Sequence, residues 1–154
     1  MSLADGSLDG VALPVLLRAA RHAYVSAVRQ ALDDAGCDDV PSNGSYVIGS
    51  MANRGVPLSE IVRELRVSKQ ATGQLVDTLV ARGYLDRSVD SEDRRRLNIS
   101  LTERGRAAAG VVRSAIEGVD VALERRVGQE FIENARAVLA ALVELSGPSV
   151  EEPV

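Results

Sequence analysis

The chain has 154 residues, 45% of them apolar, and its single Phe and lack of Trp predict one compact domain with an aliphatic core. One Cys excludes an internal disulfide, and one Cys with one His supplies too few ligands for a zinc site, so we expect no metal and no other cofactor. The apolar runs 11–17 and 137–143 are too short to cross a bilayer, and a lone Cys suits a reducing compartment, which together predict a cytoplasmic protein without a membrane partner.

A long amphipathic helix is predicted at 14–34. Apolar side chains recur there at helical spacing: Leu13, Leu16, Leu17, Ala20, Tyr24, Ala27, Val28 and Ala31. A loop rich in Asp, Ser, Gly and Pro follows at 36–44. Residues 45–53 then have the pattern of a short helix, closed by Arg54 and Gly55.

Two helices joined by a short turn are predicted at 57–65 and 69–82. Pro57 is tolerated at a helix start, Ser68 can cap the second helix with its hydroxyl, and Gly83 ends that helix. Apolar residues of the second helix share one face: Ala71, Leu75, Val76, Leu79 and Val80. This order of elements is that of a helix-turn-helix.

The other face of the second helix is polar and lightly charged. It contains Ser68, Lys69, Gln70, Thr72, Gly73 and Gln74. Gln can pair bidentately with adenine, Ser and Thr can donate or accept, and Gly73 lets the backbone come close, so this face suits a DNA major groove. Considered alone, the helix is better explained as an ordinary amphipathic surface helix.

A β-hairpin with a basic tip is predicted next. Residues 84–87 and 97–101 are short strand candidates, and the second alternates Leu97, Ile99 and Leu101. Between them stand Arg94, Arg95 and Arg96, which suit phosphates or a narrow minor groove. Because three acids precede the three arginines, a self-paired solvated hairpin is the alternative.

Charge is distributed unevenly along the chain. The net charge is −4, yet residues 54–106 hold eleven Arg or Lys against eight Asp or Glu. The local field at a contact surface matters more than the sum, so a mildly basic unit in an acidic protein can bind DNA. Arg54, Arg66 and Arg82 are expected to add phosphate contacts.

Two further helices are predicted at 102–127, with Thr102 as N-cap, and at 129–145. Both carry apolar stripes, the last one along Phe131, Ala135, Val138, Leu139, Leu142 and Leu145. The first and last helices of the chain thus present apolar faces far in sequence from the helix-turn-helix. We expect a homodimer that packs these helices together and places two reading helices on a palindromic site, with packing inside one chain as the alternative.

Several segments of the chain resemble a known family, the MarR (multiple antibiotic resistance regulator) transcription factors. The resemblance rests on 58–61, 67–71, 75–79, 82–85 and, above all, on Asp90-Ser91-Glu92-Asp93-Arg94-Arg95-Arg96 running into 100–105. One position departs from the family pattern, since Glu92 stands where the first wing arginine is usual. Repulsion between Glu92 and phosphate weakens the expected wing contact, which Arg94 or Arg95 must then carry.

The resemblance implies roles for further residues. Asp90 and Asp93 would hold the wing arginines in place instead of contacting DNA. The family's effectors are small aromatic or amphipathic molecules that bind between the dimer helices and the winged lobe. The corresponding candidates here are Arg21, Tyr24, Tyr46 and Met51, each of which is also readily explained as a core or rim residue.

Other chemistry has little support in the sequence. His22, the sole histidine, lies on the polar side of the first predicted helix, with no nucleophile elbow and no base partner near it in sequence. Cys37 is flanked by Asp33, Asp34, Asp38 and Asp39, whose charges disfavour a reactive thiolate. We therefore do not expect an enzyme.

The fold class expected is mainly α with a small β-hairpin wing, a winged helix-turn-helix with N- and C-terminal dimerisation helices. Within a single domain 1–154, segments 13–35 and 128–146 would dimerise, 45–101 would form the winged lobe and 102–127 would connect them. The expected function is sequence-specific regulation of transcription on double-stranded DNA, as a dimeric repressor possibly relieved by a ligand. The alternative is a winged-helix module that associates with proteins, which Glu92 keeps open.

Overall fold

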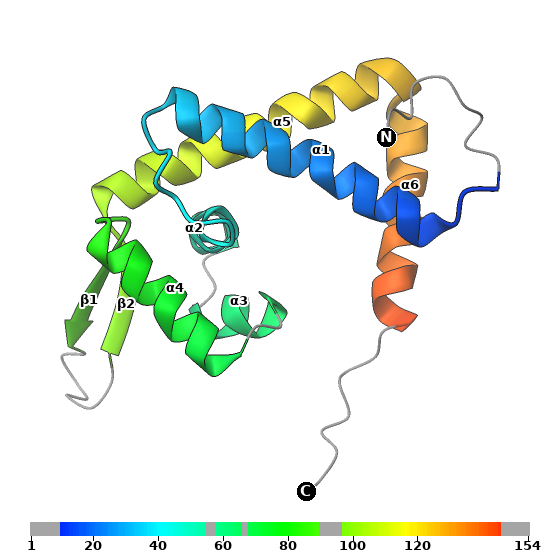
Figure 1. Cartoon of the computed structure of the whole chain (residues 1–154). Helices are drawn as coiled ribbons and strands as arrows, with labels where there is room; N and C mark the ends of the chain where they lie inside the picture. Colours follow the sequence, from blue (N-terminus) through cyan, green and yellow to red (C-terminus); the bar gives the residue numbers. More distant parts are fainter. Residues whose placement is uncertain (1–9, 55–57, 66–67, 90–96, 146–154) are drawn as a thin grey trace, which may run out of the picture. The chain divides into compact units, whose positions relative to one another are not determined.

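A computed structural model describes residues 10–54, 58–65, 68–89 and 97–145 of the chain. The elements run in the order α1 (Leu13–Asp34), α2 (Gly44–Arg54), α3 (Leu58–Leu65), α4 (Lys69–Ala81), β1 (Leu85–Val89), β2 (Leu97–Leu101), α5 (Glu103–Val127) and α6 (Gln129–Leu145) (Figure 1). The expected class, mainly α with one β-hairpin, is confirmed. The chain divides into two compact units, Met1–Glu117 and Gly118–Val154.

Local capping sets the ends of α4. The hydroxyl of Ser68 accepts a hydrogen bond from the Ala71 amide at 3.2 Å, as expected for an N-cap. At the other end Gly83 has a φ of 74°, and the amides of Gly83 and Tyr84 bond the carbonyls of Val80 and Leu79, both at 2.9 Å. This is a Schellman motif, which satisfies the last carbonyls of the helix and turns the chain away from it.

The hairpin pairs β1 and β2 as antiparallel strands, with Leu85 opposite Leu101 and Arg87 opposite Ile99. β2 has the expected bounds. The expected first strand, 84–87, is wrong by one residue at its start and two at its end, because the strand spans Leu85–Val89. Tyr84 is left out because its amide closes α4 through the bond to Leu79.

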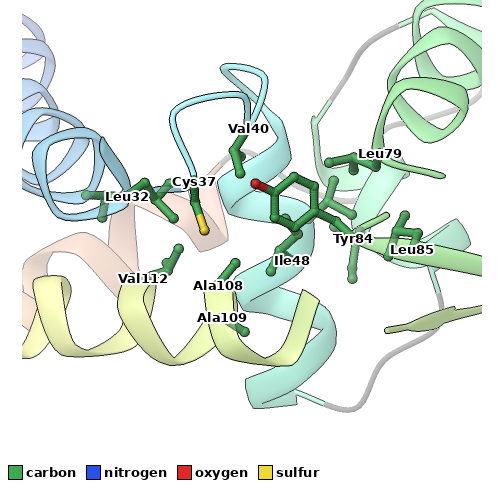
Figure 2. Close-up of a cluster of buried hydrophobic side chains, with 13 residues drawn as sticks. Leu32, Cys37, Val40, Ile48, Leu79, Tyr84, Leu85, Ala108, Ala109 and Val112 are labelled. Atoms are coloured by element: carbon green, nitrogen blue, oxygen red, sulfur yellow. The ribbon is translucent and has the colours of Figure 1, made fainter. Parts of the chain in front are cut away.

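The core of the first unit is aliphatic except for one ring. Side chains of α1, α2, α3, α4 and α5 meet there, and the largest fully buried ones are Tyr84, Leu32, Ile48, Ile61, Leu79, Leu85 and Val47. Figure 2 shows the Tyr84 ring between Val40, Ile48 and Leu79. Tyr84 therefore sits in the core that joins the two helices of the motif to the rest of the unit.

The first turn of α5 passes very close to the backbone of Tyr84. Thr102 caps this helix, with its Oγ1 accepting from the Gly105 amide at 3.0 Å and its own amide bonding the Tyr84 carbonyl at 3.1 Å. A Cβ placed on Gly105 would lie 2.1 Å from the Tyr84 carbonyl oxygen. Only glycine fits this contact without a shift of the backbone.

In the second unit, α6 has no buried residue although it is rich in apolar side chains. The most exposed are Phe131, Val138, Val143 and Leu145, between 56% and 83%. A helix with this composition needs an apolar partner surface. None of the described helices is both long and apolar enough to span a membrane.

Candidate nucleic-acid interface

The N-terminal half of α4 presents a polar edge. Ser68, Lys69, Gln70, Gly73 and Gln74 are exposed and Thr72 is half-buried. Val76 and Leu79 are buried on the other side of the same helix. Ala71 was expected on the apolar face and is exposed instead, because the first turn of α4 projects beyond the core.

Donors and acceptors on this edge are largely free. Thr72 donates its hydroxyl proton to the Ser68 carbonyl at 3.0 Å, which leaves its oxygen able to accept. Among the described residues, Lys69, Gln70 and Gln74 make no side-chain hydrogen bond. No atom lies within 4 Å of the position that a Cβ would take on Gly73. The edge thus offers two amides, one ammonium and an open stretch of backbone.

An ion pair joins α4 to the hairpin. Arg87 of β1 binds the carboxylate of Asp77 of α4, and both side chains remain partly exposed. The pair fixes the hairpin against the flank of α4, next to the polar edge.

The arginines expected on phosphates have different surroundings. Arg82 follows α4, and its guanidinium donates to the backbone carbonyl of Asp39 in the loop between α1 and α2. Arg54 is the last residue of α2. The remaining residues of the expected interface lie outside the described residues: Arg66, Asp90, Glu92, Asp93, Arg94, Arg95 and Arg96. Their roles stay predictions.

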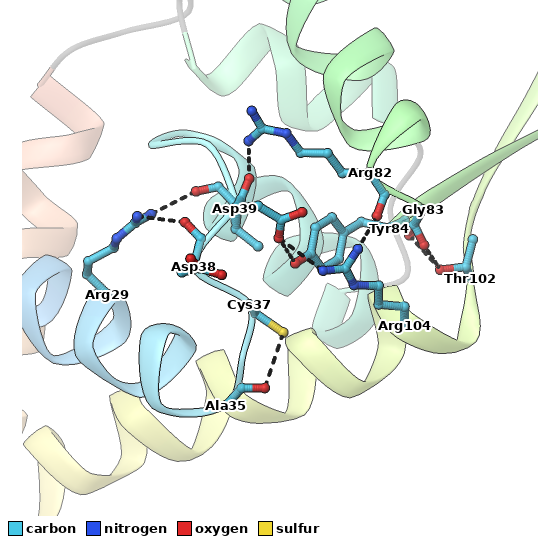
Figure 3. Close-up of polar contacts among 11 residues, drawn as sticks. Arg29, Ala35, Cys37, Asp38, Asp39, Arg82, Gly83, Tyr84, Thr102 and Arg104 are labelled. Atoms are coloured by element: carbon cyan, nitrogen blue, oxygen red, sulfur yellow. Dashed lines mark hydrogen bonds and ion pairs between the residues drawn. The ribbon is translucent and has the colours of Figure 1, made fainter.

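Asp39 is the centre of a polar cluster beside the reading helix (Figure 3). Its carboxylate accepts hydrogen bonds from the Tyr84 hydroxyl and, at 3.1 Å, from the guanidinium of Arg104. Arg104 also donates to the carbonyl of Arg82 and lies 4.3 Å from the centroid of the Tyr84 ring. The Asp39 carboxylate therefore binds one cation and a phenol, and the carbonyl of the same residue binds a second cation.

The cluster shifts both acidities. The hydrogen bond from Tyr84 holds the pKa of Asp39 below its ordinary value of 3.8, with further lowering by the charges of Arg104 and Arg82 that burial partly opposes. Burial raises the pKa of Tyr84 above its ordinary value of 10.0, and the hydrogen bond to Asp39 raises it further. Asp39 is therefore ionised and Tyr84 neutral at physiological pH.

Sequence reasoning did not find this cluster. The sequence pattern predicts a strand at Tyr84, a helix at Arg104 and a loop at Asp39, and it gives none of the three a side-chain partner. The paired residues lie 45 and 65 positions from Asp39, so no local spacing signals the contact. The available signal was weaker: an acid in a loop, and an arginine and a tyrosine two residues apart in a motif.

A cavity of about 580 Å³ lies in the first unit between α1, α2 and α5. Arg21, Tyr24 and Tyr46, three of the four residues proposed for an effector, line it together with apolar side chains that include Val28, Val112 and Ile116. Met51, the fourth, does not line it and packs against the core. Arg21 has no ion-pair partner among the described residues, so the cavity combines an apolar wall with one free cation.

His22 and Cys37 do not line this cavity. His22 is exposed on α1 and lies 3.3 Å from the Ser26 hydroxyl. Cys37 is buried in the core, with its thiol 3.9 Å from the carbonyl of Ala35. Within the described ranges, no group of three or more His, Cys, Asp or Glu side chains is arranged to hold a metal.

Comparison with known proteins gives a fold and a family match over part of the chain. Residues 39–96 match the sequence model of the MarR family. Among curated proteins, none matches the chain. Its fold is similar to that of S. aureus MepR in a complex with DNA, with a TM-score of 0.69 and 21% identity over 86% of this chain and 97% of that one.

Two further solved structures have the same fold. NadR in complex with 4-hydroxyphenylacetate gives a TM-score of 0.67 at 20% identity, covering 89% of this chain and 96% of NadR. The transcriptional regulator PA4135 gives 0.67 at 20% identity, covering 92% and 98%. At such identities these matches establish the fold alone.

The helix pair, the exposed edge of α4 and the hairpin behind it define the class of this molecule, a winged helix-turn-helix protein. Residues 39–96, which include this helix pair, are similar to the MarR family of transcription regulators.

Proposed function

We propose that the chain is a sequence-specific DNA-binding regulator of transcription that acts as a dimeric repressor. The observation that carries the proposal is the polar edge of α4, where Lys69, Gln70 and Gln74 are exposed and unpaired among the described residues, opposite buried Val76 and Leu79. Such an edge can reach base edges in a major groove. The S. aureus MepR structure that matches this fold is a complex with DNA, which supports the same use of the fold here.

The dimer is proposed from the apolar side chains of the last helix. No residue of α6 is buried in the single chain, and a second copy of the chain is the partner that requires no other protein. Dimerisation through the terminal helices, 13–35 and 128–146, would present two reading helices to successive turns of one DNA face. A palindromic operator follows from that symmetry.

The proposal extends to relief of repression by a ligand in the cavity between α1, α2 and α5. Two tyrosines and an apolar wall suit a small aromatic or amphipathic molecule, and the free guanidinium of Arg21 suits an acidic group on it. The matching NadR structure contains 4-hydroxyphenylacetate, and a matching MepR structure contains ethidium bromide. A ligand would act by favouring a conformer in which the reading helices no longer fit successive grooves.

A footprint over the intergenic DNA upstream of the protein's own gene, repeated at two salt concentrations, tests the function. The expected result is a protected palindrome that persists at the higher salt concentration. Uniform protection that disappears with salt would show nonspecific binding only and contradict the proposal. No binding at either salt concentration would favour the winged-helix protein-association module.

A further inference from the structure

The segment Arg82–Tyr84 leads from the reading helix α4 into β1 and is held by a residue of a distant loop. Asp39 accepts from the Tyr84 hydroxyl and the Arg104 guanidinium through its carboxylate, and from Arg82 through its carbonyl. Figure 3 shows these side chains converging on Asp39 from α5 and from the joint between α4 and β1. One residue therefore binds both ends of this three-residue joint.

The loop that carries Asp39 is itself fixed to α1. The guanidinium of Arg29 donates to the carbonyls of Asp38 at 2.7 Å and Val40 at 2.8 Å, on either side of Asp39. Arg29 also forms an ion pair with Asp33 of its own helix at 3.2 Å. Asp39 thus stands on a support that belongs to α1 and not to the helix-turn-helix.

The joint needs such a support because it contains a glycine in the left-handed region. Gly83 has a φ of 74°, and no atom lies within 4 Å of the place of its absent Cβ, so packing at this residue does not restrain the joint. The Thr102 hydroxyl donates to the Gly83 carbonyl at 2.5 Å, and on either side of Gly83 the side chain of Arg82 bonds the Asp39 carbonyl and that of Tyr84 bonds its carboxylate. A small rotation here would tilt the whole of α4.

We propose that Asp39 is a positioning residue for DNA reading, which fixes the direction of α4 relative to α1 through Arg82, Tyr84 and Arg104. The inference rests on the proposed function, because a fixed helix direction matters only if α4 enters a groove. Two reading helices fit an operator only when both tilt correctly for its half-site spacing. Asp39 therefore contributes to the choice of spacing without touching DNA.

The test compares Asp39→Asn with Asp38→Asn in the full-length protein. Both substitutions remove one negative charge from adjacent loop positions, but the carboxylate of Asp38 makes no hydrogen bond and no ion pair among the described residues. Affinity is measured on three DNAs: the footprinted operator, the same operator with one base pair added between half-sites, and unrelated DNA. Amide hydrogen exchange at 82–87 is measured on the free proteins.

Loss of the charge weakens the charge-assisted hydrogen bonds from Arg104 and Tyr84. For Asp39→Asn we expect amide exchange at 82–87 to accelerate by about three- to tenfold. Affinity for the correct operator should fall by about tenfold, which is within the usual range of coupling between sites. Affinity for the lengthened operator and for unrelated DNA should change much less, so discrimination between spacings shrinks. Asp38→Asn should resemble wild type throughout.

A merely structural role gives a different pattern. If Asp39 only stabilises the fold, the variant loses affinity for all three DNAs equally and exchanges faster across the whole first unit, which overturns the proposal. Equality of Asp39→Asn and Asp38→Asn overturns it as well, as does faster local exchange with unchanged discrimination. If wild type shows no specific binding, the proposed function fails first, and the exchange data alone decide whether Asp39 holds α4.

Discussion

Tyr84 combines a fully buried ring with a hydroxyl that reaches a partly exposed carboxylate. The ring fills the core between Val40, Ile48 and Leu79, while the hydroxyl donates to Asp39 (Figure 2). A phenol in this position does what neither Phe nor a smaller polar residue can do. It packs as an apolar group and extends one hydrogen bond from the core to the loop that supports α4.

Replacement of Tyr84 by Phe measures how much that hydrogen bond contributes to the free energy of unfolding. At neutral pH we expect a loss of about 1–3 kcal/mol of unfolding free energy, because the Asp39 carboxylate loses its closest partner. Since the pKa of Tyr84 is raised in the folded state, its contribution is complete below its ordinary value of 10.0 and is lost as pH rises above it. Denaturant unfolding from pH 7 to 11 should therefore show the difference between the two proteins shrinking only above about pH 10. A difference independent of pH would contradict the assignment.

At the scale of elements, the contact between α5 and the Tyr84 backbone is the tightest glycine site described. Gly105→Ala would place a Cβ 2.1 Å from the Tyr84 carbonyl oxygen, and we expect it to cost about 1–3 kcal/mol through forced displacement of α5. Gly110→Ala is the matched control on the same helix, where no atom lies within 4 Å, and it should stabilise by up to about 1 kcal/mol. Thermal unfolding of both variants checks the pair. Equal stability changes would show that the first turn of α5 relaxes freely.

Elements could be predicted because their causes are local. Ser68 caps α4 through a bond to Ala71, Gly83 ends it through a positive φ, and Thr102 begins α5 through a bond to Gly105. Each signal acts within a few residues, so the helix bounds agree to within one or two positions. The predicted start of β1 is one residue too early because the Tyr84 backbone serves other elements. Its amide closes α4 through Leu79, and its carbonyl accepts from Thr102 at the start of α5.

The polar edge of α4 could be anticipated for the same reason, since helical periodicity alone separates it from Val76 and Leu79. The Asp39 cluster could not. Its bonds join residues 43, 45 and 65 positions apart, and the sequence does not specify which of several loop acids meets Tyr84. Asp38 and Asp39 are equivalent in sequence, and only the packing of the loop on α1 distinguishes them.

At the scale of the whole molecule, the proposed dimer depends on the exposed apolar side chains of α6. Val138 is 56% exposed, and Glu at this position would carry a charge into any interface formed there. We expect Val138→Glu to shift sedimentation from dimer to monomer at micromolar concentration. Ala140→Glu, two residues further and therefore on a different side of the helix, adds the same charge and should remain dimeric. Identical sedimentation of both variants and wild type would exclude α6 from the interface.

The distribution of charge over the molecule leads to a prediction for the wing, whose tip lies outside the described residues. Residues 54–106 carry a local excess of basic over acidic side chains in a chain of net charge −4, so loss of Arg94 and Arg95 removes most of that excess. The double change to Ala should weaken operator binding by at least about tenfold and lower the salt dependence by up to about 1.8 in slope per subunit, for two lost phosphate contacts in each wing. Arg125 and Arg126 in the last turn of α5 provide the control, because their double change to Ala removes the same charge outside the reading lobe. If the two double variants lose affinity equally, the wing acts only through net charge. The hairpin then does not enter the groove, in agreement with the repulsion between Glu92 and phosphate.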